Sequence, residues 1–186
     1  PLAAYRTLET ALHIDLPYTL LFDICIKGIR TQSNECKTSS ELGGFWNTVQ
    51  WLMAQGEIIE GGDFEIKYMT FIKTNKVSMQ WQEEHPVLIM QKSRIFMLYR
   101  QSGRSVGDVV LPEESLRYYL EHSKAYLGEK TYRFKVYNKG VPVYDKNRPN
   151  GNNGYCEAET VQRAYVFDYR KIIEAFDINL ERANAE

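Results

Sequence analysis

The stretch SSELGGFWNTVQWLMAQGEIIEGGDFEIK, residues 39–67, has the most distinctive pattern in the chain. Apolar residues from Leu42 to Met53 recur at helical spacing, and Gly56 follows them as a helix-ending glycine would. Two short segments then flank Gly61-Gly62, a pair that permits the positive φ angles of a two-residue hairpin turn. The stretch therefore predicts a helix followed by a hairpin, which is the layout of a winged-helix module.

Two further helices are predicted before this stretch, over residues 2–12 and about 18–37. Ser39 or Ser40 would cap the start of the third helix. Gly43-Gly44 lowers the helix propensity of its first turn, and close packing against the preceding helix would explain the pair. Residues 1–82 are thus expected to form a helical bundle that ends in a winged-helix-like hairpin.

Residues 83–186 predict a second unit, a mixed sheet with one central helix and a short terminal helix. A helix is expected from Pro112 to about Leu127, where Glu113 and Glu114 suit the first turn, and another over residues 169–176. Residues 145–155 read as a loop by composition. Strands are expected at 87–90, 94–100, 131–137, 141–144 and 162–167. The predicted fold class is α+β in two units, 1–82 and 83–186.

Composition places the chain among ordinary globular proteins, because 44% of its 186 residues are hydrophobic and 25% are charged. No apolar run is long enough for a membrane span, and the first residues do not form a secretion signal. The three cysteines form no close pair, which fits a reducing compartment, so we expect a cytoplasmic protein. The missing initiator Met predicts that the chain is a fragment of a longer protein.

No local motif predicts a catalytic, metal or cofactor site. The three histidines are far apart, and no cysteine has a second ligand at zinc-site spacing. There is no phosphate-binding GxxxxGK[ST] or GxGxxG motif. Neither Cys25 nor Cys36 has a neighbouring histidine that would activate its thiol. We therefore expect a binding function without metal or cofactor.

Charge is unevenly distributed along the chain. Residues 63–148 hold 15 Lys and Arg against 10 Asp and Glu, whereas both ends are acidic and the net charge is −1. This basic centre supplies candidate phosphate contacts. With Lys67 beside the expected wing, these candidates are Arg94, Arg100, Arg104, Arg117, Lys130, Arg133 and Lys135.

Two further patterns are compatible with nucleic-acid binding. Asn47 and Gln50 share the polar face of the third predicted helix, from which such side chains could read adenine edges; the alternative is a plain solvated face. Tyr132 and Phe134 alternate with basic residues, as in a platform on which single-stranded bases stack. An ordinary half-buried sheet has the same alternation.

The order of several stretches resembles the C-terminal region of the primase–helicase proteins of phages and mobile elements. These stretches include ELGGFWNTVQWLMAQGEIIEGGDFEI, RIFMLYRQSGRSVGDVVLPEESLRYYLEHSKAYLG and QRAYVFDYRKIIEAFDINLE. The resemblance implies a tail with winged-helix elements that follows an ATPase core, whose Walker motifs are absent here. It implies a non-catalytic, nucleic-acid-binding module of a DNA replication or mobilisation protein. The alternative is a protein–protein interaction or oligomerisation module without DNA contact, docking the ATPase core or a partner subunit.

Overall fold

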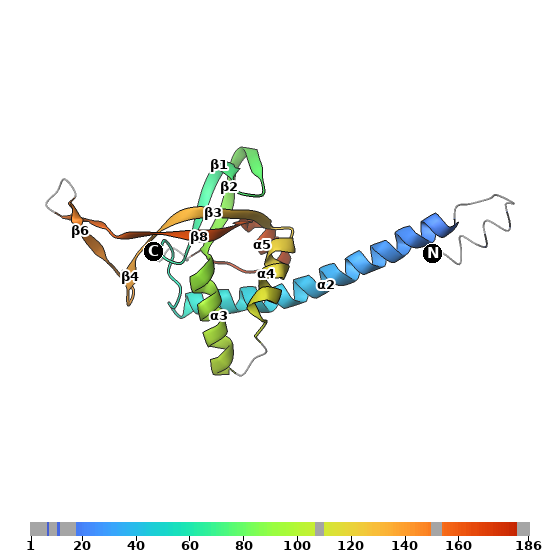
Figure 1. Ribbon diagram of the computed structural model, residues 1–186, viewed down its shortest axis with the longest axis horizontal. Helices are drawn as coiled ribbons and strands as arrows, with labels where there is room; N and C mark the ends of the chain where they lie inside the picture. Colours follow the sequence, from blue (N-terminus) through green and yellow to red (C-terminus); the bar gives the residue numbers. More distant parts are fainter. Residues whose placement is uncertain (1–6, 8–10, 12–17, 107–109, 150–153, 182–186) are drawn as a thin grey trace. The chain divides into compact units, whose positions relative to one another are not determined.

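The computed structural model describes residues 7, 11, 18–106, 110–149 and 154–181, and it contains both helices and strands (Figure 1). The α+β class is confirmed. The contacts divide the chain into two units, Pro1–Ser40 and Glu41–Glu186. The expected boundary after residue 82 instead falls inside strand β2, which runs from Ser78 to Gln91. The helix expected at 2–12 lies almost entirely outside the described residues.

One helix, α2 (Tyr18–Ala54), replaces the two helices and the serine cap expected over residues 18–53. The described part of residues 1–82 therefore contains one long helix in place of a bundle. No proline interrupts α2, and serines in its middle cost little helix propensity. Gly43 and Gly44 are not sites of close packing, because a Cβ on either would meet nothing within 4 Å.

The expected hairpin around Gly61-Gly62 is not formed. Residues 59–63 make a tight turn, in which the amides of Gly62 and Asp63 both donate to the Ile59 carbonyl, at 3.1 and 2.8 Å. Strand β1 begins only at Phe64 and continues to Lys73. It pairs antiparallel with β2 across a turn at residues 74–77. The hairpin of this region thus lies one strand later than predicted.

The main sheet has the order β1-β2-β8-β3, where β3 is Tyr126–Lys135 and β8 is Glu159–Asp168. All three strand pairs are antiparallel, so the expectation of a mixed sheet is wrong.

The sheet curls until its edge strands meet at both ends. At one end the Lys135 amide donates to the Gly61 carbonyl at 2.8 Å. At the other end Thr74 Oγ1 donates to the Leu127 carbonyl at 2.6 Å, and the Asn75 amide donates to the Glu129 carbonyl at 3.1 Å. The curl thereby satisfies backbone groups that a flat sheet would leave open at its edges.

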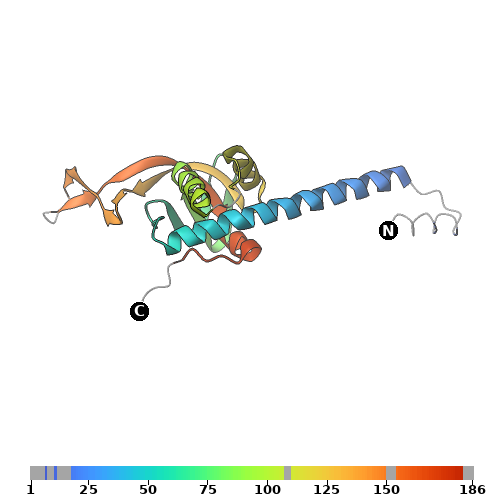
Figure 2. The same ribbon diagram turned by 90° about the horizontal axis from the view of Figure 1, so that it is seen from below.

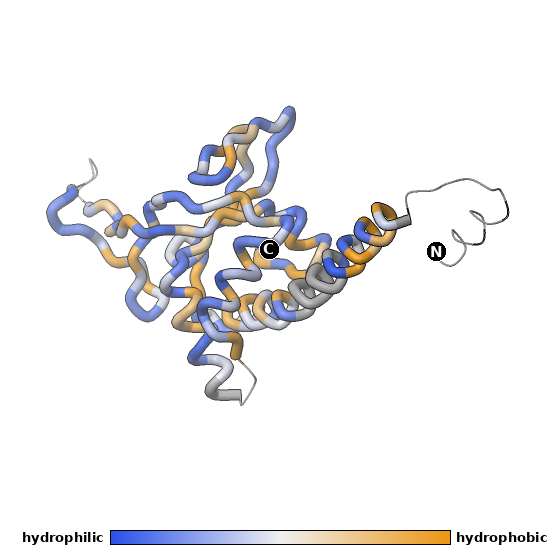
Figure 3. Tube along the Cα trace, turned by 45° about the vertical axis from the view of Figure 1, so that its right-hand side comes forward, coloured by the Kyte–Doolittle hydropathy of each residue, from blue (hydrophilic) through white to orange (hydrophobic). Residues whose placement is uncertain are grey.

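Two apolar cores lie on opposite faces of the sheet, because side chains alternate along each strand. In β2, Val87 and Ile89 belong to the core inside the curl, whereas Leu88 and Met90 belong to the core under the helices. Figure 3 shows apolar residues interspersed with polar ones along the trace of the sheet. The core under the helices also receives Leu42, Phe45, Trp46, Val49 and Leu52 from the last turns of α2.

Three shorter helices complete this face: α3 (Lys92–Val106), α4 (Glu113–His122) and α5 (Tyr169–Phe176). The strand expected at 94–100 is therefore wrong, since these residues belong to α3. Its buried side chains Ile95, Leu98 and Tyr99 follow the helical spacing of three and four residues. Helix α5 has the predicted bounds, and the Asp168 side chain caps it by accepting from the Lys171 amide. No described helix is long and apolar enough to cross a membrane.

The ends of β3 and β8 lead from the sheet into a projecting segment, and residues 131–163, which include these strand ends, are called the arm here. The described part of the arm also contains β4 (Tyr137–Asn138), β5 (Val141–Pro142), β6 (Tyr144–Pro149) and β7 (Tyr155–Glu157). Both views show the arm extending away from α3, α4 and α5 (Figure 1 and Figure 2). The loop expected at 145–155 is thus partly strand, and residues 150–153 lie outside the described residues.

Candidate functional site

The arm is one of the basic parts of the chain. Residues 131–163 hold six Lys and Arg against three Asp and Glu, so the arm carries +3 in a chain of net charge −1. It also exposes two aromatic side chains, Tyr144 at 53% and Tyr155 at 48%. Cations and exposed aromatic rings together can bind a phosphate backbone and its bases.

Several arm cations are paired with acidic neighbours on the surface. Lys135 Nζ lies 2.7 Å from Glu157 Oε2, and its hydrogen bond to this carboxylate raises the pKa of Lys135. Glu159 Oε2 lies 3.7 Å from Arg133 Nη1 and 3.8 Å from Arg148 Nη1. Solvent-exposed pairs of this kind contribute little free energy, so a phosphate can compete for the same cations.

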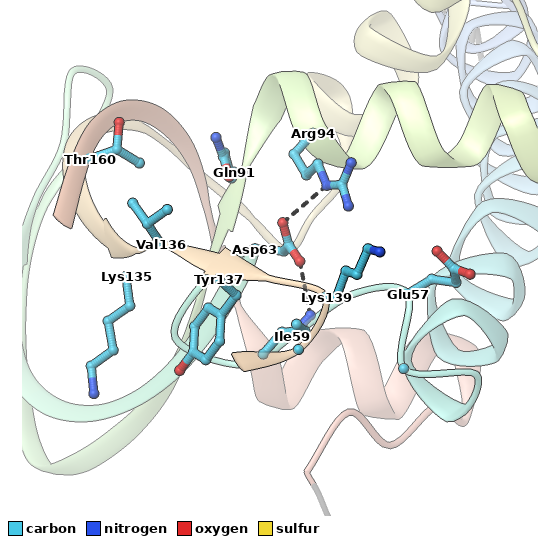
Figure 4. A pocket seen from close by; sticks show the side chains of 13 residues that line it. Glu57, Ile59, Asp63, Gln91, Arg94, Lys135, Val136, Tyr137, Lys139 and Thr160 are labelled. Atoms are coloured by element: carbon cyan, nitrogen blue, oxygen red, sulfur yellow. Dashed lines mark hydrogen bonds and ion pairs between the residues drawn. The ribbon is translucent and has the colours of Figure 1, made fainter. Parts of the chain in front are cut away.

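A polar cavity of about 530 Å³ lies at the base of the arm (Figure 4). Its walls come from the turn after α2, the start of α3, the base of the arm and β8. The charged side chains around it are Glu57, Asp63, Arg94, Lys135 and Lys139. Residues far apart in the sequence therefore form one site.

Asp63 holds Arg94 in place at this cavity. The Asp63 carboxylate accepts from the Ile59 amide at 2.9 Å and lies 3.4 Å from Arg94 Nε. Burial raises the pKa of Asp63, and the Ile59 amide and Arg94 oppose this change. The Arg94 side chain is 39% exposed. Within the described part of the chain, its terminal nitrogens Nη1 and Nη2 have no protein partner.

Lys139 also lines the cavity, from the tight turn between β4 and β5. Its φ is 50° and that of Gly140 is 81°, the combination that a two-residue type I′ turn requires. Asparagine or glycine is the usual residue at the first of these positions, because a lysine Cβ is unfavourable at positive φ. Among the described residues, the Lys139 ammonium has no hydrogen bond or ion pair.

Gly61 and Gly62 join the turn after α2 to the arm. Gly61 has a φ of 82°, and a Cβ on Gly62 would lie only 2.7 Å from Tyr137 Cδ2. Gly61 is therefore favoured by its positive φ, and Gly62 by the close approach of the Tyr137 ring.

The sequence-predicted residues Asn47, Gln50, Lys67 and Lys130 lie in two places. Asn47 is exposed on α2, and Gln50 Nε2 donates to the Asn179 carbonyl at 3.5 Å. Lys67 and Lys130 lie over the Tyr132 ring, with Nζ 5.1 and 5.2 Å from its centroid. The hydrogen bond with Tyr132 raises the pKa of Lys67, whereas burial lowers that of Lys130.

The predicted arginines are spread over the helices and the arm. On α3, Arg100 Nη1 lies 3.8 Å from Glu113 Oε2, while the side chain of Arg104 lies outside the described residues. On α4, Arg117 Nε lies 2.8 Å from Glu121 Oε1. Of the nine predicted residues whose side chains the structure describes, it brings only Arg94 and Lys135 to the cavity and places Arg133 with Lys135 on the arm.

The expected stacking platform belongs to the sheet interior. Phe134 is fully buried in the core inside the curl, and Tyr132 is half-buried. The Tyr132 hydroxyl donates to Glu65 Oε2 at 2.5 Å across the closing edges of the sheet. The ordinary half-buried sheet is thus the correct interpretation of this alternation.

Sequence reasoning missed Lys139, Tyr144, Arg148 and Tyr155. The loop-like composition of residues 145–155 hid the arm strands, although the Lys139-Gly140 dipeptide is a recognisable turn signal. Over the described ranges, no group of three or more His, Cys, Asp and Glu could hold a metal ion.

Comparisons with known proteins give no relative for this chain. No protein-family model, curated protein or solved structure matches it.

Proposed function

We propose that this chain is a non-catalytic, nucleic-acid-binding module of winged-helix type. The order of elements supports this assignment: β2 is followed by α3, α4, β3 and β8, and β8 pairs with both β2 and β3. In a winged helix, two helices follow the first strand, and the hairpin that ends the domain returns to pair with that strand. Helices α3 and α4 then take the helix–turn–helix position, and the arm is the wing.

The observation that carries the proposal is the concentration of positive charge and exposed tyrosines on the arm. Helix α4, in the position of a recognition helix, instead carries Glu113, Glu114 and Glu121 against Arg117. An acidic helix repels phosphates, so the arm is the element that contacts nucleic acid. Contacts from Lys and Arg to phosphates depend little on base sequence. We therefore propose binding that is mainly electrostatic and has little sequence preference.

The resemblance to phage and mobile-element primase–helicases supplies the wider setting of this proposal. In that setting, the chain is the tail of a cytoplasmic DNA replication or mobilisation protein, and an ATPase core elsewhere in the protein performs the catalysis. The arm would hold DNA close to that core.

A fluorescence-anisotropy titration with labelled single- and double-stranded oligonucleotides at 50 and 200 mM salt tests the proposed function. Four phosphate contacts on a single strand would weaken binding on the order of 50-fold between these salt concentrations. Undetectable binding at 50 mM salt would reject the nucleic-acid assignment.

The groove between α3 and α4 favours a second candidate, a protein-interaction module. A cavity of about 360 Å³ there is lined by Phe96, Met97, Arg100 and Glu113, among others. On α4, the Tyr118 side chain is 58% exposed and stacks on His122, with ring centroids 4.1 Å apart. Exposed aromatic residues are typical anchors of protein interfaces. This candidate would be favoured if the chain binds the ATPase core but no DNA, and if Tyr118→Ala abolishes the binding to the core.

A further inference from the structure

We propose that the cavity between Arg94 and Lys139 binds one phosphate group of a nucleic-acid strand that the arm holds. The inference rests on the proposed function and adds a defined phosphate site to it. Both side chains extend toward the same cavity from different elements, Arg94 from α3 and Lys139 from the base of the arm (Figure 4).

Arg94 has the geometry of a fixed anion-binding group. Its Nε faces the Asp63 carboxylate at 3.4 Å, and Asp63 is in turn fixed by the Ile59 amide at 2.9 Å. This leaves Nη1 and Nη2 as donors, in a side chain that is partly exposed to the cavity. A guanidinium held along one edge can present its other nitrogens to two oxygens of a phosphate.

Lys139 supplies the second positive charge. Its backbone adopts a left-handed φ of 50°, which asparagine would adopt more easily. The geometry of the turn therefore gives no reason for a lysine at this position. A residue in an unfavourable backbone conformation is a reason to look for a function of its side chain. Here the side chain places an ammonium, without a described protein partner, at the edge of the cavity (Figure 4).

The acidic side chains at the cavity do not neutralise all of its positive charge. Asp63 has both carboxylate oxygens engaged, by Arg94 and by the Ile59 amide. Glu57 is exposed at the rim and opposes an anion there, while Lys135 is engaged with Glu157. Among the described charged side chains at the cavity, Arg94 Nη1 and Nη2 and Lys139 Nζ are therefore the donors left to bind a single phosphate.

The position of the cavity favours a phosphate that belongs to a strand. Residues 135–140 at the base of the arm form one of its walls, so a strand that follows the arm reaches the cavity. The volume of about 530 Å³ also lies within the range of small-molecule sites. The alternative ligand is therefore a small molecule that carries a phosphate group.

Lys139→Asn tests the site without endangering the fold, because Asn-Gly is the preferred sequence of this turn. The full chain and the variant are titrated with a labelled 20-nucleotide oligothymidylate at several salt concentrations. Loss of one contact should weaken binding about eightfold at 50 mM salt and reduce the slope of log affinity against log salt by about 0.7. Lys73→Asn, an exposed lysine at the end of β1, is the matched control and should bind like the wild type.

A titration with pyrophosphate, followed through the amide NMR signals of Gly62 and Gly140, separates the two sources. Shifts of both signals that Lys139→Asn abolishes support the site. If they occur in a chain that binds no oligonucleotide, the proposed function fails and the site serves a free phosphate compound. Oligonucleotide binding that Lys139→Asn leaves unchanged overturns the site and leaves the proposed function intact. If pyrophosphate causes no shifts and the chain also binds no oligonucleotide, both proposals are overturned.

Discussion

Gly62 has a different role from the one that its sequence context predicts. A glycine pair between two apolar segments indicates a hairpin turn, yet the space above Gly62 is filled by the Tyr137 ring, from a residue 75 positions later. A glycine that a local turn requires and a glycine that a contact with a distant segment requires look the same in the sequence. Sequence patterns identify the first kind of requirement well but not the second. The prediction of a hairpin turn at the Gly-Gly pair is wrong, because the contact with Tyr137 cannot be found in the local sequence.

We expect Gly62→Ala to destabilise the protein by about 1–3 kcal/mol, because the added Cβ would lie 2.7 Å from Tyr137 Cδ2. Gly44→Ala is the matched control. A Cβ there meets nothing within 4 Å, so the change should stabilise α2 by about 0.5–1 kcal/mol. Urea unfolding monitored by circular dichroism measures both. If both substitutions change the free energy of unfolding equally, the close contact between Gly62 and the Tyr137 ring is not what requires a glycine at this position.

At the scale of elements, the secondary structure predicted from the sequence is wrong for α3 and for part of the arm. Ile95, Phe96, Leu98 and Tyr99 are all buried in α3, and so short an apolar run fits a strand as well as a helix. The arm contains Asn, Gly and Pro in residues 145–155, a composition that indicates loop even though β6 and β7 pair there. Elements with a clear period, such as α5 and the strands at 87–90 and 162–167, were predicted correctly.

The curl of the sheet depends on the turn between β1 and β2. Thr74 Oγ1 donates to the Leu127 carbonyl at 2.6 Å and accepts from the amides of Lys76 and Val77 at 3.2 and 3.1 Å. Thr74→Val keeps the shape and removes these bonds, so we expect a loss of about 1–2 kcal/mol in the free energy of unfolding.

Thr74→Ser retains the hydroxyl and should lose less than half as much as Thr74→Val. Urea denaturation of both variants gives the comparison. If the serine variant is as unstable as the valine variant, the hydroxyl does not hold the closed end of the sheet.

At the scale of the whole molecule, the α+β class and the basic centre could be predicted, but the candidate site could not. The uneven charge along the chain indicates a basic centre at residues 63–148, and the arm of charge +3, residues 131–163, overlaps only its C-terminal end. The cavity combines Asp63, Arg94 and Lys139, which lie 31 and 45 positions apart along the chain. No short-range spacing marks such a combination, because only the closing of the sheet against the arm brings these residues together.

Charge reversal on the arm tests the central claim most directly. Lys146 and Arg148 are exposed on β6, so Lys146→Glu combined with Arg148→Glu removes two cations of the arm without touching a core. Lys73→Glu with Arg170→Glu makes the same change in net charge on exposed residues outside the arm.

The measurement is the affinity of both double variants and the wild type for the same oligonucleotide at 50 mM salt. If the arm is the nucleic-acid contact, the arm variant should bind more than about tenfold more weakly, whereas the control should stay within about threefold of the wild type. Equal losses in the two variants would mean that only net charge matters and would contradict the assignment of the arm.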